Sequence, residues 1–578
     1  MMAPIVIQLD DDDCDGIVTE KDIPEIVFST YLGNNYRGNG TLHAISVKGG
    51  ALVEKWAVKA SDAEIHPGVS IAAGNFDGAP GNEIVACLTN GSARAFDADG
   101  QVLWTSEGGG CAMPAIGDLD QDGAPEVVTE RRIIDGKTGA TKAVFATIIG
   151  NFALYDVDGD GRLDVVATNA VYGADGALRY SAGAAGSYVA IGDLDKDGVP
   201  EIVNIDSALH TFTVWHLVDD ASGGPGAKKA EVIRTGVDIN GDAWPGNCLP
   251  GSSGYTRGGG PPTVADFNGD GFADVALAGG VAYAVFDGKK LMDGSVASAD
   301  TVLWAKKTQD CSSAATGSSI FDFDGDGKAE VVYADETQLH VYQGTDGADL
   351  ASICNTSGTL VEYPLVADVD NDGQADLIVA SNSYSSITCA DGSKTAGIRI
   401  FGDEHGKWVR TRRVWNQHTY HVTNVNEDGS IPAAELPNFS QPRLNNFRQN
   451  VQPVGEFSAP DLVVSLSATC AGGYRLIARV RNIGEAYAPP GIPVAFYLGD
   501  PASGGTLLGT GATTRALYPL DTEDVAVSLS NPPAAVTDGS GQLFARLGDG
   551  GAVPGTFHQC RDDNDTSAPA SGRCNGPR

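Results

Sequence analysis

The amino-acid sequence predicts an all-β protein in which a seven- or eight-bladed β-propeller precedes a smaller β-sandwich. A nine-residue acidic pattern recurs along the first three quarters of the 578 residues. Short apolar runs rich in β-branched residues flank its copies, as expected for strands that tight loops join. After Pro453 the acidic pattern stops and alternating apolar and polar residues begin, which favours a second domain.

Each full copy of the acidic pattern has oxygen-bearing side chains at positions 1, 3, 5 and 9 and glycine at position 6. Side chains with this spacing converge on one point, and a calcium ion requires six to eight oxygens. Magnesium is less suited because it demands a more rigid octahedron. The alternative is a solvated acidic turn, in which the crowded carboxylates would repel one another. The predicted ligands are Asp118, Asp120, Asp122 and Glu126; Asp156, Asp158, Asp160 and Asp164; Asp193, Asp195, Asp197 and Glu201; Asp266, Asn268, Asp270 and Asp274; Asp322, Asp324, Asp326 and Glu330; and Asp368, Asp370, Asp372 and Asp376.

Two further loops are variants of this pattern. Near the start of the chain, a twelve-position loop of the EF-hand type predicts one more calcium site. Its predicted ligands are Asp11, Asp13, Asp15 and Asp22. The loop from Asn75 to Glu83 lacks the carboxylate at position 5 and the glycine at position 6, so no ion is expected there. We therefore expect about seven calcium ions in total.

The spacing of the loops predicts the blades. With both variants included, loops begin at eight positions that lie 37 to 73 residues apart. This spacing suits one four-stranded blade per loop, with insertions of variable length. Apolar runs such as Val264-Ala265 before a loop and Ile202-Val203 after one indicate buried strands. Radial closure would cover the strand edges that tandem hairpins leave open, and the eight loops favour eight blades.

Residues 1–455 resemble the FG-GAP/VCBS-repeat proteins, whose blades carry Asp-x-Asp-x-Asp-Gly-x-x-Asp calcium loops as in the propeller of integrin α subunits. The resemblance implies a calcium-binding propeller, although integrin-type propellers have seven blades. The segment Trp408 to Asn450, with Arg413-Val-Trp-Asn-Gln-His-Thr-Tyr420, is similar to the segment that ends the propeller in related secreted bacterial proteins.

Residues 456–578 have the texture of an immunoglobulin-like β-sandwich. Leu476, Ala478 and Val480 are expected to face inward, while Arg475, Arg479 and Arg481 face water. The stretch Val480-Arg-Asn-Ile-Gly484, followed by Val494-Ala-Phe-Tyr-Leu498, resembles the CARDB domain, a bacterial module related to cell adhesion. The resemblance therefore implies an adhesive role.

The net charge and the cysteines of the chain indicate which binding partners and which cellular compartment suit the protein. Lys and Arg number 38 against 75 Asp and Glu, and the formal charge of −37 argues against nucleic acid and anionic lipid. No apolar run approaches the roughly 20 residues that span a bilayer. Ten cysteines without a Cys-x-x-Cys pair favour several disulfides, of which Cys560–Cys574 closes the shortest loop among the C-terminal cysteines. We expect a secreted or cell-surface protein with a signal sequence upstream of this chain.

The densest polar cluster outside the loops is the run from Arg410 to His421. Arginines beside a Tyr or His base suit a polysaccharide lyase that acts on acidic glycans. The favoured alternative is a closing segment whose polar groups are satisfied locally. No Gly-x-Ser-x-Gly, His-Glu-x-x-His or Walker motif is found. We therefore expect an adhesion or ligand-binding module for an extracellular protein or glycan, without catalysis of its own, and lyase activity is the second hypothesis.

Overall fold

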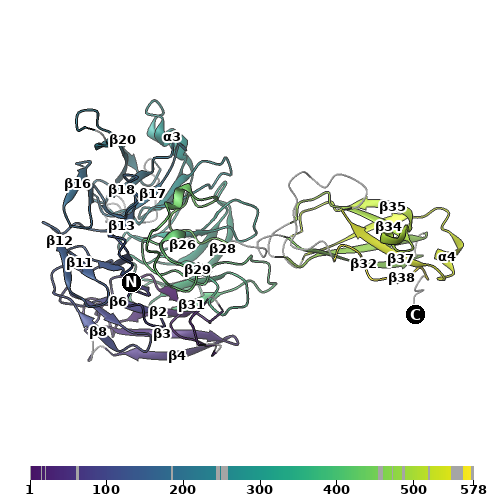
Figure 1. The fold of residues 1–578 in the computed structure, drawn as a ribbon, viewed down its shortest axis with the longest axis horizontal. Coiled ribbons are helices and arrows are strands. Elements are labelled where there is room, and N and C mark those ends of the chain that lie inside the picture. The colour runs from purple at the N-terminus through teal and green to yellow at the C-terminus, as the bar shows by residue number, and fades with distance from the viewer. Residues whose placement is uncertain are drawn as a thin grey trace. The chain divides into compact units, whose positions relative to one another are not determined.

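A computed structural model gives the fold of the chain (Figure 1). It describes residues 2–12, 14, 16–19, 21–59, 61, 64–183, 186–224, 226–241, 248, 258–452, 460–470, 473–484, 488–517, 521–548 and 564–573. The chain divides into two compact units. The first contains Met1–Phe321, Lys328–Phe401 and Thr411–Val451, and the second contains Asp322–Gly327, Gly402–Arg410 and Gln452–Arg578. The domain boundary predicted at 455/456 lies outside the described residues and stays a prediction.

The described part of the first unit consists of antiparallel sheets that follow one another along the chain, seven with four strands and one with three. They are β1 to β4 (Ile5–Ile7, Glu25–Thr30, Thr41–Lys48, Ala51–Val58), β5 to β8 (Ile71–Gly74, Glu83–Cys87, Ala93–Phe96, Val102–Thr105), β9 to β12 (Ala115–Gly117, Glu126–Val128, Arg132–Asp135, Thr141–Val144), β13 to β16 (Phe152–Tyr155, Asp164–Ala167, Ala170–Tyr172, Leu178–Ser181), β17 to β20 (Val189–Gly192, Glu201–Asp206, Thr211–Asp219, Lys228–Asp238), β21 to β24 (Thr263–Ala265, Asp274–Ala278, Ala282–Phe286, Val302–Lys307), β25 to β28 (Ser318–Phe321, Glu330–Ala334, Gln338–Tyr342, Asp349–Cys354) and β29 to β31 (Leu365–Ala367, Asp376–Ser381, Gly397–Phe401). The short helices α3 (Gly288–Met292) and η1 (Ser298–Thr301) interrupt the sixth sheet between its third and fourth strands.

Burial decreases from the first strand of a sheet to the last. In the second sheet, β5 and β6 are buried throughout, whereas Val102 and Leu103 of β8 are exposed. Strands buried on both faces are nearly continuous apolar runs, which is why the runs beside each loop were recognisable in the sequence. The predicted all-β class and its four-stranded antiparallel sheets are thus confirmed.

The eight sheets form a β-propeller-like ring (Figure 1). The first strand of each sheet contacts the first strand of the next, from β1 to β29. The ring closes because Ile5 and Ile7 of the first sheet share one hydrophobic cluster with Leu365 and Ile378 of the last. Burial of this apolar surface holds the two ends of the ring together.

Residues Thr411–Val451, which we call the central strap, lie where the first strands of the sheets converge. Apart from the single turns η2 (Val422–Asn424) and η3 (Asn438–Ser440), the strap has no regular helix or strand. It bonds instead to the first strand of every sheet. Its bonds are Val6 N to Trp415 O (2.9 Å), Ala73 N to Asn416 O (2.8 Å), Ile116 N to Gln417 Oε1 (2.9 Å), Phe439 N to Tyr155 Oη (3.0 Å), Arg448 Nη1 to Val189 O (3.1 Å), Phe447 N to Val264 O (2.9 Å), Ile320 N to Arg448 O (3.2 Å) and Asn450 Nδ2 to Val366 O (2.9 Å). The strap therefore occupies the centre of the ring.

The second unit contains two antiparallel sheets that share one hydrophobic cluster. One sheet has β32 (Leu462–Thr469), β33 (Arg475–Asn482) and β36 (Thr522–Ser528), and the other has β35 (Thr506–Ala512), β34 (Pro493–Leu498), β37 (Gln542–Leu547) and β38 (Ala570–Ser571), with the short helices η5 (Pro501–Ser503) and α4 (Ala534–Thr537). Leu476, Ala478 and Val480 are buried on β33, while Arg475, Arg479 and Arg481 are exposed, as the alternation predicts. None of the helices among the described residues is both long and apolar enough to cross a membrane.

Candidate metal-binding loops

Each acidic loop joins the first strand of a sheet to the second. The position-9 carboxylate is the first residue of the second strand in all six full copies, as for Glu126 of β10 and Asp376 of β30. The strand that the preceding apolar run forms therefore ends where the ligands begin. The sheet fixes the two ends of the loop, so that its side chains meet in one place.

The position-1 aspartate and the position-6 glycine have the same hydrogen bond in all six copies. The amide N–H of the glycine donates to the aspartate, with N to O distances from 2.8 Å at Asp118, Asp266 and Asp322 to 3.2 Å at Asp368. The glycines need a left-handed backbone, with φ of 83° at Gly123 and 86° at Gly161. In five of the copies, the position-5 side chain also accepts the N–H of position 7 at 2.8 or 2.9 Å. The repeated sequence thus gives one repeated turn.

The position-9 carboxylate closes the loop by accepting the N–H of position 2. This bond measures 2.9 Å from Leu119 to Glu126 and 2.8 Å from Leu194 to Glu201. The closing carboxylates are buried at Glu126, Asp164, Glu201, Asp274 and Glu330. A buried carboxylate that keeps its charge needs a positive partner nearby.

The geometry of the loops is suited to binding a cation. Carboxylate oxygens lie within 4.8 Å of one another in the groups Asp118, Asp120 and Asp122; Asp156, Asp158 and Asp164; and Asp193, Asp195 and Asp197. Two buried oxygens, Asp120 Oδ1 and Asp368 Oδ1, have no hydrogen-bond partner. Such clusters can hold metal ions, and an all-oxygen donor set suits a hard cation.

Burial is the main cause of the raised pKa values in these loops, and neighbouring carboxylates add to it. The pKa rises to about 8 at Asp164 and Asp376, and to about 7 at Glu201, Asp274 and Asp322. Without a cation, the folded state therefore favours protonated carboxyls.

The N-terminal variant adopts the same turn. Gly16 N donates to Asp11 Oδ2 at 2.7 Å, and the closing role belongs to Asp22, which accepts Asp12 N at 2.8 Å. Asp13 and Asp15 lie outside the described residues, so their predicted role stays a prediction.

Sequence reasoning missed a second acidic group in this first sheet. Glu25 begins β2 and accepts Leu9 N at 2.8 Å, so it occupies the closing position of the other sheets. Lys55 Nζ contacts Glu25 at 2.8 Å and also contacts Asp10. Glu25 lies beyond the inserted Asp11–Asp22 loop, and only its place at the start of an apolar run distinguished it.

The variant loop from Asn75 to Glu83 satisfies itself without a cation. Asn75 Nδ2 donates to the carbonyls of Ala79 (2.6 Å) and Gly81 (2.8 Å), and Asn75 Oδ1 accepts Gly78 N at 2.9 Å. Burial raises the pKa of the closing Glu83 to about 8. An amide in place of the first aspartate supplies the donors that a loop of carboxylates lacks.

The polar cluster considered for lyase chemistry belongs largely to the central strap. Arg412, Arg413, His418, Tyr420 and His421 are all buried. Arg412 donates to the carbonyls of Val422 (2.7 Å) and Val425 (2.6 Å), and His421 contacts Glu435 at 2.5 Å. Most polar groups of this segment thus have partners within the ring, although His418 Nδ1 has none.

Within the described part of the ring, three disulfides join segments at the other ends of the sheets. They are Cys87–Cys111, Cys248–Cys311 and Cys354–Cys389. Because the strands are antiparallel, these cysteines lie at the ends opposite the acidic loops. The expected bridge Cys560–Cys574 falls outside the described residues.

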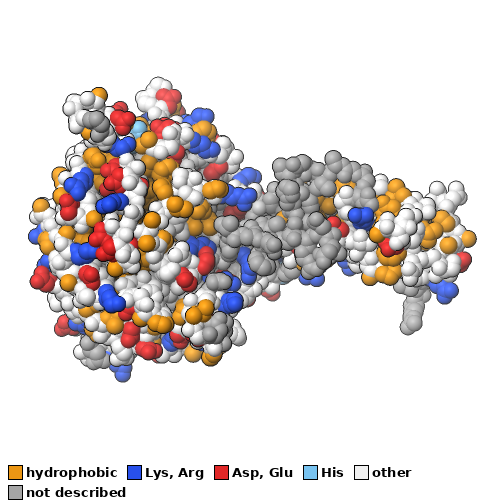
Figure 2. All heavy atoms as spheres, viewed as in Figure 1, with side chains coloured by type: hydrophobic (Ala, Val, Ile, Leu, Met, Phe, Trp, Pro, Cys, Tyr) orange, Lys and Arg blue, Asp and Glu red, His pale blue; other side chains and the backbone are white. Residues whose placement is uncertain are grey.

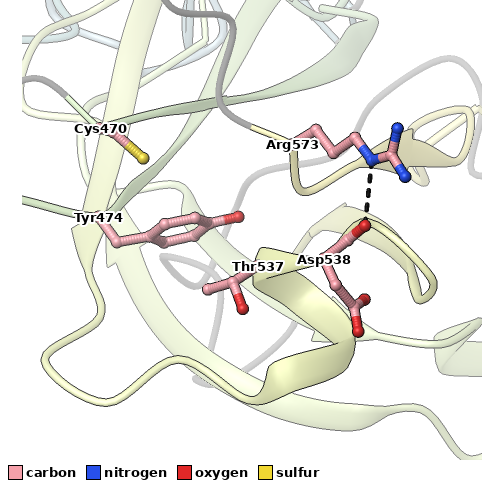
Figure 3. Close-up of a pocket in the computed structure, with 5 residues that line it drawn as sticks. All are labelled: Cys470, Tyr474, Thr537, Asp538 and Arg573. Carbon is pink, nitrogen blue, oxygen red and sulfur yellow. Dashed lines mark hydrogen bonds between the residues drawn. The ribbon is translucent and has the colours of Figure 1, made fainter.

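The second unit carries an open depression of about 510 Å³ (Figure 3). Cys470, Tyr474, Thr537, Asp538 and Arg573 line it, and Arg573 Nε donates to the Asp538 carbonyl at 3.0 Å. The other polar groups bond to residues outside the lining, such as Tyr474 Oη to Gly572 O and Thr537 Oγ1 to Ala534 O. Figure 2 shows acidic and basic side chains interspersed over the viewed face of the first unit, without a large area of one charge.

Comparison with known proteins supports part of this description. The model of the FG-GAP-like repeat family matches residues 322–379. The crystal structure of the V. cholerae biofilm matrix protein Bap1 superposes with a TM-score of 0.60 at 19% identity, covering 78% of this chain and 96% of that one. The C-terminal WD40 domain of Sif2 gives a TM-score of only 0.35 at 12% identity, covering 65% of this chain and 95% of that one. No curated protein matches the sequence.

Proposed function

We propose that the chain is a calcium-stabilised extracellular module for adhesion or ligand binding, without catalysis of its own. The recurrence of one turn in six full loops carries the calcium part, because each turn gathers carboxylates that are costly to bury without a cation. The ligands would be the predicted residues of these loops, together with those of the Asp11–Asp22 loop. Calcium would supply the positive charge that closes each loop.

The eight sheets would be eight blades, with the C-terminal residues 456–578 forming an immunoglobulin-like domain of the CARDB kind. The consecutive sheets of the ring and the two sheets around one hydrophobic cluster support this division. A rigid ring with loops at both ends suits the display of a binding surface, since loops on a fixed scaffold carry recognition in many proteins.

An extracellular location and partner are supported by two observations. The three disulfides fit an oxidising compartment. The similar structure of Bap1 belongs to a biofilm matrix protein. The partner would be an extracellular protein or glycan.

The second hypothesis, a lyase for acidic glycans, loses its main support because its candidate residues are buried in the central strap. A direct test separates the two. The protein, with calcium or with a chelator, is applied to an array of glycans and matrix proteins and, in parallel, to polyuronates. Calcium-dependent capture without a rise in ultraviolet absorbance supports the module, whereas release of unsaturated uronate would overturn it.

A further inference from the structure

Lys142 projects from the outer strand β12 into the acidic loop of its own sheet. Its Nζ lies 2.8 Å from Asp120 Oδ2, 2.5 Å from Glu126 Oε1 and 4.0 Å from Asp122 Oδ2. The side chain keeps 30% of its exposure, while that of Glu126 keeps 2%. One ammonium group therefore contacts residues at positions 3, 5 and 9 of the Asp118 loop.

Three other full loops contact side chains that carry no ammonium group. The Tyr180 hydroxyl donates to Asp158 at 3.1 Å, the His216 ring contacts Glu201 at 3.0 Å, and the Gln343 amide donates to Glu330 at 3.0 Å. Arg413 approaches the Asp368 loop, but through Asp368 alone, at 3.5 Å. None of these four contacts brings an ammonium to three carboxylates of one loop, as Lys142 does at the Asp118 loop.

The first sheet shows what such a lysine can replace. There Lys55 bonds to Asp10 and to Glu25, the carboxylate in the closing position, where the full acidic pattern is missing. In a sheet that lacks the full nine-residue motif, a lysine thus supplies the positive charge beside the closing carboxylate. In the third sheet, the lysine and the complete motif are present together.

We propose that Lys142 is a built-in counter-cation of the Asp118 loop that competes with calcium. The inference rests on the proposed calcium binding of the sister loops. An ammonium a few ångströms from a divalent ion repels it, and it engages carboxylate oxygens that would otherwise serve the ion. Asp120 Oδ1 remains without a partner, so the loop can still accept calcium. This loop therefore keeps its closed turn in the absence of calcium and binds calcium more weakly than it would without Lys142.

Calcium titration of the stripped protein tests the proposal with Lys142→Met, which keeps most of the aliphatic stem. Lys306→Met is the matched control, because Lys306 also lies on the outer strand of a sheet, is 30% exposed, and contacts Asp349 rather than a loop carboxylate. In Lys142→Met, one bound ion is expected to bind at least tenfold more tightly than in the wild type, while Lys306→Met matches the wild type. Equal titrations for all three proteins would overturn the role of Lys142. A wild type that binds no calcium would overturn the proposed function instead.

Hydrogen exchange on the wild type gives a test that requires no variant. After chelation, amides of residues 119–126 are expected to stay protected, whereas those of residues 157–164, whose loop has no lysine, exchange at least tenfold faster than with calcium. Equal loss of protection in both loops would contradict the proposal.

Discussion

Glu83 is a buried carboxyl group in the one loop that we expect to lack calcium. Burial, aided by Asp77, raises its pKa to about 8, so the folded state favours its protonated form. The stability that this preference contributes is complete below the unfolded pKa of about 4.5 and is lost as the pH rises through about 8. Between those values, each pH unit costs up to about 1.4 kcal/mol.

We therefore predict that Glu83→Gln flattens the pH dependence of stability. Between pH 6 and pH 9 in saturating calcium, the variant should lose less free energy of unfolding than the wild type, because the amide does not ionise. Denaturant unfolding at both pH values measures this difference. Glu404→Gln, at an exposed position, is the control, and identical pH dependence in all three proteins would refute the prediction.

Asn450 is a residue of the central strap whose side chain bonds to several buried groups. Its Nδ2 donates to Val366 O at 2.9 Å, and its Oδ1 accepts Tyr420 Oη at 2.9 Å and Val451 N at 3.0 Å. Asn450→Ala should lower the free energy of unfolding by about 2 to 4 kcal/mol, because buried polar groups lose their partners. The exposed Asn426→Ala, which loses one bond to Ser430, should change it by less than about 1 kcal/mol. Equal stability of the two variants would show that the strap does not hold the ring.

The proposed function depends on the repeated acidic loops. A substitution at Asp270 tests one of them. Asp270 is exposed and accepts Phe272 N at 2.9 Å, so its replacement disturbs little besides the proposed ion. Asp270→Ala should bind one calcium ion fewer and gain less thermal stability from calcium, yet match the wild type in chelator. Asp99→Ala, an exposed aspartate in a hairpin, should bind as many ions as the wild type. Elemental analysis and thermal melts decide, and an unchanged ion count in Asp270→Ala would contradict the ligand assignment.

The loops and their flanking strands were predictable because both signals are local. Position 9 begins the second strand in every full copy, so one short motif specifies the loop and the strand after it. The closing role of Glu25 was not predicted, because an insertion separates Glu25 from β1. The path of the central strap was not predictable, because its hydrogen-bond partners, such as Val6 and Ile320, are distant in sequence. Disulfide connectivity likewise depends on the closed ring, which brings connecting segments together.

At the scale of the whole molecule, calcium should stabilise the two units unequally. Ions that bind only the folded loops add stability by mass action. All of the proposed loops join strands of the ring, although Asp322–Gly327 of one loop groups with the second unit, and the sequence has no full acidic pattern after Pro453. Calorimetry of the oxidised chain should therefore show one transition that falls on chelation and another that stays nearly constant. Equal shifts of both transitions would refute this division.

Seven bound ions would bring fourteen positive charges to a chain whose formal charge is −37. The neutralised carboxylates would no longer repel one another, which explains how so acidic a ring can remain compact. The ion count is thus the most direct measure of the central claim. Elemental analysis of the purified protein, after dialysis against micromolar calcium, should give about seven ions per chain, or about six if Lys142 keeps its loop empty at that concentration. Two or fewer calcium ions per chain would contradict the account.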